Sequence, residues 1–128
     1  LTMDVAHPDV EDFITIKQDL TKVTGANVSV RISDEFMQAV ENDTEYVQHW
    51  PLDNPDPKYN KTIKARELWN KIIASAHNTA EPGIIFWDRQ HRYSTSSIYP
   101  GYRNESTNPC SEVAMQGGDS CRLIAINM

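Results

Sequence analysis

The alternation of apolar and polar positions divides the first third of the chain into short elements. Residues 8–16 are predicted to form a short helix, because a proline opens the segment, acidic residues follow it and apolar residues share one face. Residues 18–26 are polar and end near a glycine, which predicts a loop. Residues 28–32 alternate between apolar and polar and indicate a half-buried strand. Ser33 can then cap a second helix.

The remaining pattern is less even. Residues 50–61 hold three prolines and are predicted to lack regular structure. Residues 65–76 carry apolar side chains at helical spacing and predict an amphipathic helix, which the Glu81-Pro82-Gly83 segment ends. Residues 84–87 form a continuous apolar run, which is typical of a strand covered on both faces rather than of an edge strand. Residues 121–128 form a last apolar run and are interpreted as another strand.

Helices alternate with strands along this pattern, which predicts an α/β fold. Two strands look buried on both faces, yet only about three helices are available to cover them. The polar, turn-rich residues 89–107 supply no further cover. The chain starts at Leu1 and stops at Met128, inside an apolar run. We therefore expect the covering elements to lie outside these residues, in a longer protein.

Composition and charge exclude several classes of protein. The 128 residues are enough for one domain. Twelve basic residues against eighteen acidic ones, a net charge of −6, disfavour a nucleic-acid-binding face. No apolar run is long enough to span a membrane, and the first residues lack the basic and apolar regions of a secretory signal. Two cysteines are too few for a disulfide scaffold.

One short segment groups side chains that suit chemistry on a polar substrate. Asn108, Cys110 and Glu112 lie at positions i, i+2 and i+4, and Pro109 disfavours a helix. In an extended segment the amide, thiol and carboxylate would face one way, as holder, reactive sulfur and base. The alternative interpretation is a turn in which Asn108 and Ser111 bond backbone groups and the cysteine is simply buried.

The second cysteine leaves three hypotheses open. Cys110 and Cys121 could form a structural disulfide, although an intracellular chain disfavours this. They could join His77 and His91 in a zinc site, without the usual ligand spacing. One thiol could instead act as a redox partner of the other.

Six segments in order resemble the large catalytic subunit of ribonucleotide reductase. They are residues 7–14, 27–31 with 34–37, 65–73, 81–88, 106–112 and 119–127. The resemblance implies that residues 1–128 are a partial slice of a ten-stranded α/β barrel, with the finger-loop segment included. The Asn-Pro-Cys form at residues 108–110 is most similar to the class II enzymes, which depend on adenosylcobalamin.

The resemblance also implies residue roles. Cys110 matches the finger-loop cysteine that becomes a thiyl radical and abstracts the 3′ hydrogen of the substrate. Glu112 matches the carboxylate that takes the 3′-hydroxyl proton, and Asn108 matches the amide that holds the substrate. Cys121 matches one cysteine of the pair whose oxidation to a disulfide supplies two electrons. The loop from Gln18 to Gly25 falls where the family places the loop that reports the allosteric effector.

Within that loop, the candidate residues are Gln18, Asp19, Lys22 and Thr24. The implied partners are a ribonucleoside di- or triphosphate, a dNTP or ATP effector, a thioredoxin-like reductant and the remainder of the reductase chain, in a cytoplasmic setting without nucleic acid or membrane. The partner cysteine, the phosphate-binding segments and the cobalamin site would lie outside residues 1–128. No metal ligand is assigned. We therefore expect the isolated chain to be inactive.

Two departures and two alternative functions accompany the resemblance. Arg122 and Ile124 stand where the family commonly has asparagine and glycine. The first alternative is a non-catalytic binding or regulatory module derived from a reductase slice. The second is a small secreted glycoprotein with one disulfide, since the chain has four Asn-X-Ser/Thr sequons. They begin at Asn27, Asn42, Asn60 and Asn104.

Overall fold

A three-stranded parallel sheet organises the protein in the computed structural model, which describes residues 1–19 and 21–128. The strand order is β1 (Thr2–Asp4), β2 (Ser29–Ile32) and β5 (Gly83–Phe86), with β2 in the centre. The helices are α1 (Val10–Thr15), the 3₁₀ turn η1 (Ile16–Gln18), α2 (Asp34–Glu41), α3 (Ala65–Thr79), α4 (Trp87–Tyr93) and the 3₁₀ turn η2 (Thr95–Ile98). Two hairpins complete the fold: β3 (Glu45–Trp50) with β4 (Tyr59–Lys64), and β6 (Ser106–Thr107) with β7 (Ala114–Met115).

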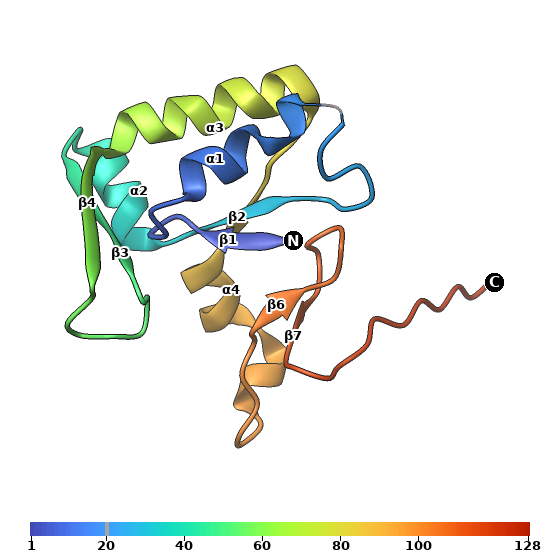
Figure 1. The fold of residues 1–128 in the computed structure, drawn as a ribbon. Coiled ribbons are helices and arrows are strands. Elements are labelled where there is room, and N and C mark those ends of the chain that lie inside the picture. Colours follow the sequence, from blue (N-terminus) through green and yellow to red (C-terminus); the bar gives the residue numbers. More distant parts are fainter. Residues whose placement is uncertain (20) are drawn as a thin grey trace.

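The central strand β2 has an apolar face and a polar face. Val30 and Ile32 are fully buried in the core that the sheet shares with α1, α2 and α3. Ser29 and Arg31 point to the opposite face, where the Arg31 guanidinium lies 5.1 Å from the centre of the Trp87 ring at the start of α4. Figure 1 shows α1 and α3 on one side of the sheet, and α4 with the β6–β7 hairpin on the other.

Three sequence predictions about helices are confirmed. The predicted helix at residues 8–16 contains α1, and Ser33 caps α2 by accepting a 3.1 Å hydrogen bond from the backbone N–H of Phe36. The amphipathic helix at residues 65–76 is α3, which buries Leu68 and Ile72. The strand predicted at residues 28–32 is β2.

The β3–β4 hairpin was not predicted. Its inward positions are Tyr46, whose ring meets Phe36 edge-on with centroids 5.1 Å apart, and the polar Gln48. Gln48 is completely buried and donates from Nε2 to the backbone oxygen of Val5 at 3.0 Å. A glutamine at a core position hides the apolar alternation, which is the signal that strand prediction uses. The prediction that residues 50–61 lack regular structure is wrong at both ends, because β3 ends at Trp50 and β4 begins at Tyr59.

The strand predicted at residues 84–87 exists as β5, and the described residues do not cover both of its faces. It lies at the edge of the sheet, and Ile84 and Phe86 are 36% and 45% exposed. Trp87 begins α4 instead of ending the strand, so the segment 89–107 holds helical turns that were not predicted. Polar helices of this length lack the apolar stripe that would reveal them.

The strand predicted at residues 121–128 is also not formed. This segment has no regular secondary structure and extends away from the rest of the molecule, with Leu123 93% exposed (Figure 1). A strand needs a neighbour for its backbone groups, and no strand among the described residues pairs with this one. The observed architecture is therefore mixed α/β with an open sheet, and the described residues form no closed barrel. None of the described helices has the length and apolar character needed to cross a membrane.

An ion cluster joins α1 to its neighbours. Glu11 contacts the Lys71 ammonium of α3 at 2.6 Å and the Lys61 ammonium of β4 at 3.1 Å. These hydrogen bonds, first that of Lys71 and then that of Lys61, lower the pKa of the Glu11 carboxyl below its usual range.

Glu11→Gln is expected to destabilise α1 by about 1 kcal/mol at neutral pH, because the cluster is partly exposed to solvent. A carboxyl with a lowered folded pKa stabilises the protein above its unfolded pKa of about 4.3, and this stabilisation is lost as the pH falls. Amide hydrogen exchange of α1 measures the difference between variant and wild type, which should shrink between neutral pH and pH of about 3. The matched control is Glu45→Gln, because the Glu45 carboxylate is more exposed than that of Glu11 and lies 3.9 Å from the Lys64 ammonium. A variant equal to the wild type at neutral pH would contradict the prediction.

Candidate functional site

The segment that carries Asn108, Cys110 and Glu112 is the turn between β6 and β7. The backbone N–H of Ser111 donates to the backbone oxygen of Asn108 at 3.0 Å, and Ser111 has a φ of +70°. The Asn108 N–H donates to the oxygen of Val113 at 3.1 Å. The segment is therefore a closed turn and not an extended run, so the argument from a period of two does not hold.

Asn108 holds this turn together from inside. Its side chain is 6% exposed, and its Oδ1 accepts a 3.1 Å hydrogen bond from the N–H of Val113. Cys110 and Glu112 are exposed instead. The turn interpretation is thus right that Asn108 bonds the backbone and wrong that Cys110 is buried. The turn presents the Cys110 thiol and the Glu112 carboxylate to solvent, whereas the Asn108 amide forms its hydrogen bond within the turn.

The turn is fastened to the polar face and the entry of β2. The Asn27 Nδ2 donates to the backbone oxygen of Pro109 at 3.2 Å. The hydroxyls of Ser29 and Ser111 lie 3.0 Å apart in a hydrogen bond. A Cβ on Gly83, in the neighbouring strand, would come within 2.8 Å of the Ser29 Oγ, so the absence of a side chain there leaves room for this contact.

A pocket of about 310 Å³ lies between the turn and the sheet. Asn108, Pro109 and Ser111 of the turn line it, together with Asn27 and Ser29 at the start of β2. The rest of the lining comes from the end of the loop before β2, from the N-terminal end of the chain and from β6: Gly25, Ala26, Leu1, Thr2, Ser106 and Thr107. Amide, hydroxyl and backbone groups dominate this lining, which suits a polar ligand held by hydrogen bonds.

Cys121 lies outside the turn between β6 and β7. Both cysteines are free thiols and both are exposed. Cys121 belongs to the irregular C-terminal segment, and the expected strand that would carry it is not formed. No group of three or more His, Cys, Asp or Glu side chains is placed to hold a metal ion in residues 1–19 and 21–128.

Sequence reasoning missed the residues that position the turn. Asn27 and Ser29 were not assigned a role in holding the turn, and Ser111 was considered only as a residue that bonds backbone groups, although the polar residues of β2 alternate with its apolar ones. That alternation indicates that a second, polar face meets something other than the helical core. The partner could not be inferred, because the contacts join residues 82 positions apart in the chain.

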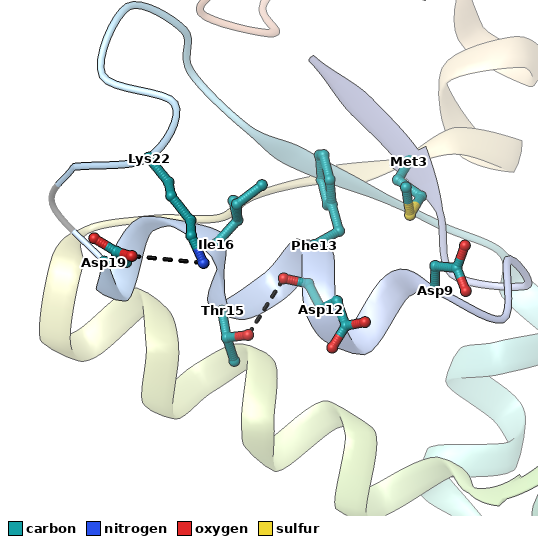
Figure 2. A pocket seen from close by; sticks show the side chains of 8 residues that line it. All are labelled: Met3, Asp9, Asp12, Phe13, Thr15, Ile16, Asp19 and Lys22. Atoms are coloured by element: carbon teal, nitrogen blue, oxygen red, sulfur yellow. Dashed lines mark hydrogen bonds and ion pairs between the residues drawn. The ribbon is translucent and has the colours of Figure 1, made fainter.

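The loop predicted at residues 18–26 borders a second pocket, of about 500 Å³, beside α1. Asp19 and Lys22 line it and contact each other at 3.5 Å (Figure 2). Gln18 ends η1 instead of lying in the loop, and it does not line this pocket. Thr24 is exposed and is also absent from the lining. Leu20, inside the predicted loop, lies outside the described residues.

The lining of this second pocket combines apolar side chains, those of Met3, Phe13 and Ile16, with charged side chains of net negative charge. Its charged side chains are the three carboxylates of Asp9, Asp12 and Asp19 and the ammonium of Lys22, which pairs with Asp19 (Figure 2). The pKa of Asp19 is lowered chiefly by the Thr21 hydroxyl and backbone N–H, which donate to its Oδ1 at 2.6 and 3.0 Å. An acidic lining repels phosphate groups. The described side chains here are therefore suited to the uncharged parts of a nucleotide rather than to its phosphates.

Comparisons with known proteins identify the family. The family model described as "Ribonucleotide reductase, barrel domain" matches residues 1–128. The chain belongs to this family.

Three relatives extend the comparison. The vitamin B12-dependent ribonucleoside-diphosphate reductase of Thermoplasma acidophilum is 41% identical over 124 residues, which cover 95% of this chain and 15% of that protein. The enzyme with the same name from Mycobacterium tuberculosis is 36% identical over 129 residues, with 98% and 18% covered. The vitamin B12-dependent ribonucleotide reductase of Agrobacterium fabrum is 35% identical over 121 residues, with 94% and 9% covered. The chain thus spans less than a fifth of the length of each.

Proposed function

We propose that residues 1–128 are part of the catalytic barrel of a ribonucleotide reductase that converts ribonucleotides to deoxyribonucleotides by thiyl-radical chemistry. The observation that carries this proposal is the family match over the whole chain, together with relatives that are named as reductases. The turn that carries Cys110 also contributes Asn108 to the lining of a pocket, which supports the proposal further, although Cys110 and Glu112 do not line that pocket. In this proposal the open edge of β5 and the extended residues 121–128 join the rest of a ten-stranded barrel, and the turn at residues 108–113 is its finger loop.

The proposed chemistry divides the work among four residues. Cys110, as a thiyl radical, takes the 3′ hydrogen of the ribose, so that a C–H bond breaks and an S–H bond forms. Glu112 accepts the proton of the 3′-hydroxyl, a role that a solvent-facing carboxylate can perform as a general base. Asn108 holds the substrate next to them. The 2′-hydroxyl takes a proton from a dithiol that includes Cys121 and leaves as water, and this dithiol supplies two electrons as it becomes a disulfide. The S–H of Cys110 then returns its hydrogen to C3′, which restores the thiyl radical.

Cys121 requires a partner thiol from another part of the protein. The chain has only two cysteines, and in this proposal Cys110 must remain a free thiol before it forms the radical. The disulfide that closes the reaction therefore forms between Cys121 and a cysteine outside residues 1–128. A thioredoxin-like reductant would restore the dithiol by thiol–disulfide exchange.

The relatives are named as dependent on vitamin B12, and we propose adenosylcobalamin as the cofactor of the whole enzyme. The residues present here do not fit it. The pockets described above, of about 310 and 500 Å³, have the size of drug-like ligand sites, and a corrin with its nucleotide tail is far larger. We therefore place the cofactor site outside residues 1–128 and derive no step through it.

The loop around Asp19 and Lys22 is proposed to report a dNTP or ATP effector, with Gln18 and Thr24 at its ends. The acidic pocket beside α1 supports contact with the base or ribose of a nucleotide and not with its phosphates. The substrate is a ribonucleoside di- or triphosphate, and we propose that the enzyme acts in the cytoplasm.

The test is a reductase assay on two polypeptides. The full chain that carries residues 1–128 is expected to form deoxyribonucleotides only when adenosylcobalamin is added. Residues 1–128 alone should form no deoxyribonucleotide. A radical intermediate needs a site shielded from solvent, and Cys110 is exposed to solvent here. Product from the isolated chain would overturn the account of the site as part of a larger barrel. A full chain without activity under any cofactor condition would favour the non-catalytic module instead.

A further inference from the structure

The carboxylate of Glu81 spans both ends of the loop 18–26. Its Oε1 lies 3.6 Å from the ammonium of Lys17, the residue before the loop. Its Oε2 accepts a 3.0 Å hydrogen bond from the backbone N–H of Val28, just beyond the loop. The Lys17 and Glu81 side chains are 16% and 24% exposed, so the pair is partly shielded from solvent. Such a charge-assisted contact is stronger than one on the open surface.

The backbone of Glu81 is fixed by hydrogen bonds from the last turns of α3. The backbone oxygen of Glu81 accepts hydrogen bonds from the hydroxyl of Ser75 at 3.1 Å and from that of Thr79 at 2.9 Å. The buried Ser75 also donates to the oxygen of Ile14 in α1 at 2.8 Å. Glu81 therefore stands on the last turn of α3, and that turn is tied to α1.

The loop has mainly local contacts of its own among the described residues. Asp19 bonds Thr21 and contacts Lys22, and these contacts do not reach the sheet. Within the loop, Val23 packs against the hydrophobic core. The placement of the loop relative to the sheet therefore depends on this contact and on the two ends of the loop. Glu81 contacts both of these ends.

The exit of the loop also carries the cysteine-bearing turn. Val28, which Glu81 holds, lies between Asn27 and Ser29 in the chain. These two neighbours make the contacts to Pro109 and Ser111 in the turn. One backbone position thus connects the Glu81 carboxylate, the loop and the turn that carries Cys110.

We propose that Glu81 is a positioning residue that couples the loop 18–26 to the Cys110 turn, by holding Lys17 and Val28 at a fixed separation. This inference rests on the proposed function, in which the loop reports an effector to the active site. Without the Glu81 contacts, a conformational change in the loop would displace only the loop ends and would not reach the turn. With Glu81 in place, the change moves Asn27 and therefore the turn.

The experiment uses the full reductase chain that contains residues 1–128. The variants are Glu81→Ala, which removes both contacts, Glu81→Gln, which retains an acceptor for the Val28 N–H, and Asn27→Ala. Glu45→Ala is the matched control, because Glu45 pairs with Lys64 on the exposed β3–β4 hairpin. The first readout is the kcat/KM of the four ribonucleoside diphosphates with and without each of the four dNTPs. The second is amide hydrogen exchange of residues 17–28.

Glu81→Ala is expected to reduce the effector-induced change in substrate preference about tenfold and to raise exchange at residues 17–28 by a similar factor. The turnover of Glu81→Ala without effector should stay within about threefold of wild type. Glu81→Gln should lose about a third to half of the effector-induced change in substrate preference, measured on a logarithmic scale. Glu81→Ala with Asn27→Ala should lose little more than either variant alone, because both lie on one route.

Two results would overturn the inference. One is a wild-type effector response in Glu81→Ala, and the other is full additivity of the two substitutions. A wild-type chain that reduces no ribonucleotide would contradict the proposed function instead. In that case, unchanged hydrogen exchange at residues 17–28 in Glu81→Ala would still contradict the proposal that Glu81 holds Lys17 and Val28 at a fixed separation, and faster exchange would support it.

Discussion

Cys110→Ser in the full reductase chain is expected to abolish deoxyribonucleotide formation, with a fall of at least about 10⁴-fold in turnover. A hydroxyl hydrogen is bound more strongly than a thiol hydrogen, so serine cannot form an equivalent radical. Because every 1.4 kcal/mol added to the barrier costs a factor of ten in rate, this difference in bond strength is decisive. The measurement is product formation under saturating substrate and adenosylcobalamin.

Structure and chemistry can be separated in that variant. The turn is closed by contacts of Asn108, Ser111 and Val113, and Cys110 is exposed, so serine should leave the turn intact. Unchanged hydrogen exchange at residues 106–115 would show that the turn is preserved and that the loss is chemical. Turnover within tenfold of the wild type would contradict the assignment of Cys110 as the radical residue.

Cys121→Ser is expected to fail at a different step. Hydrogen abstraction by Cys110 does not use Cys121, so the substrate radical should still form. Without the dithiol the two-electron reduction cannot finish, and the substrate should decompose with release of its base. Multiple-turnover product should fall to background, at least about 10³-fold below the wild type.

Electron paramagnetic resonance of each variant mixed with substrate and adenosylcobalamin, together with a measurement of released base, distinguishes the roles of the two cysteines. The Cys121 variant should give a substrate-derived radical and free base, whereas the Cys110 variant should give neither. The matched control is Ser120→Ala, which alters the neighbouring position and leaves both thiols. Identical failure of the two cysteine variants, with no radical and no base from either, would contradict this division of roles.

The helical half of the fold follows from local patterns in the chain. The apolar stripe of α3, the capping hydroxyl of Ser33 and the alternation in β2 each carry a short-range signal, and each element forms where that signal lies. The β3–β4 hairpin was missed because a buried glutamine, Gln48, replaces an apolar residue on its inner face. The contact with Val5 satisfies the Nε2 of this glutamine, whereas its buried Oε1 has no hydrogen-bond partner among the described residues.

The strand predictions depend on distant neighbours and were less accurate. The apolar runs at residues 84–87 and 121–128 indicate burial, yet the described residues leave β5 at an edge and the last segment without a partner. The turn at residues 108–113 shows the same limit. Its side-chain types indicated chemistry, but spacing alone suggested one shared direction, whereas Asn108 points inward to close the turn. The residues that place the turn lie 82 positions earlier in the chain.

The close approach at Gly83 constrains how this chain can vary during evolution. Position 83 faces the Ser29 hydroxyl, and that hydroxyl faces Ser111. A methyl group at position 83 would rotate the Ser29 hydroxyl away from Ser111, because the oxygen is the atom that it meets first. Positions 29, 83 and 111 therefore form one unit of substitution across three separate segments. We therefore expect the residue at position 83, which does not contact the turn, to vary together with the residues at positions 29 and 111.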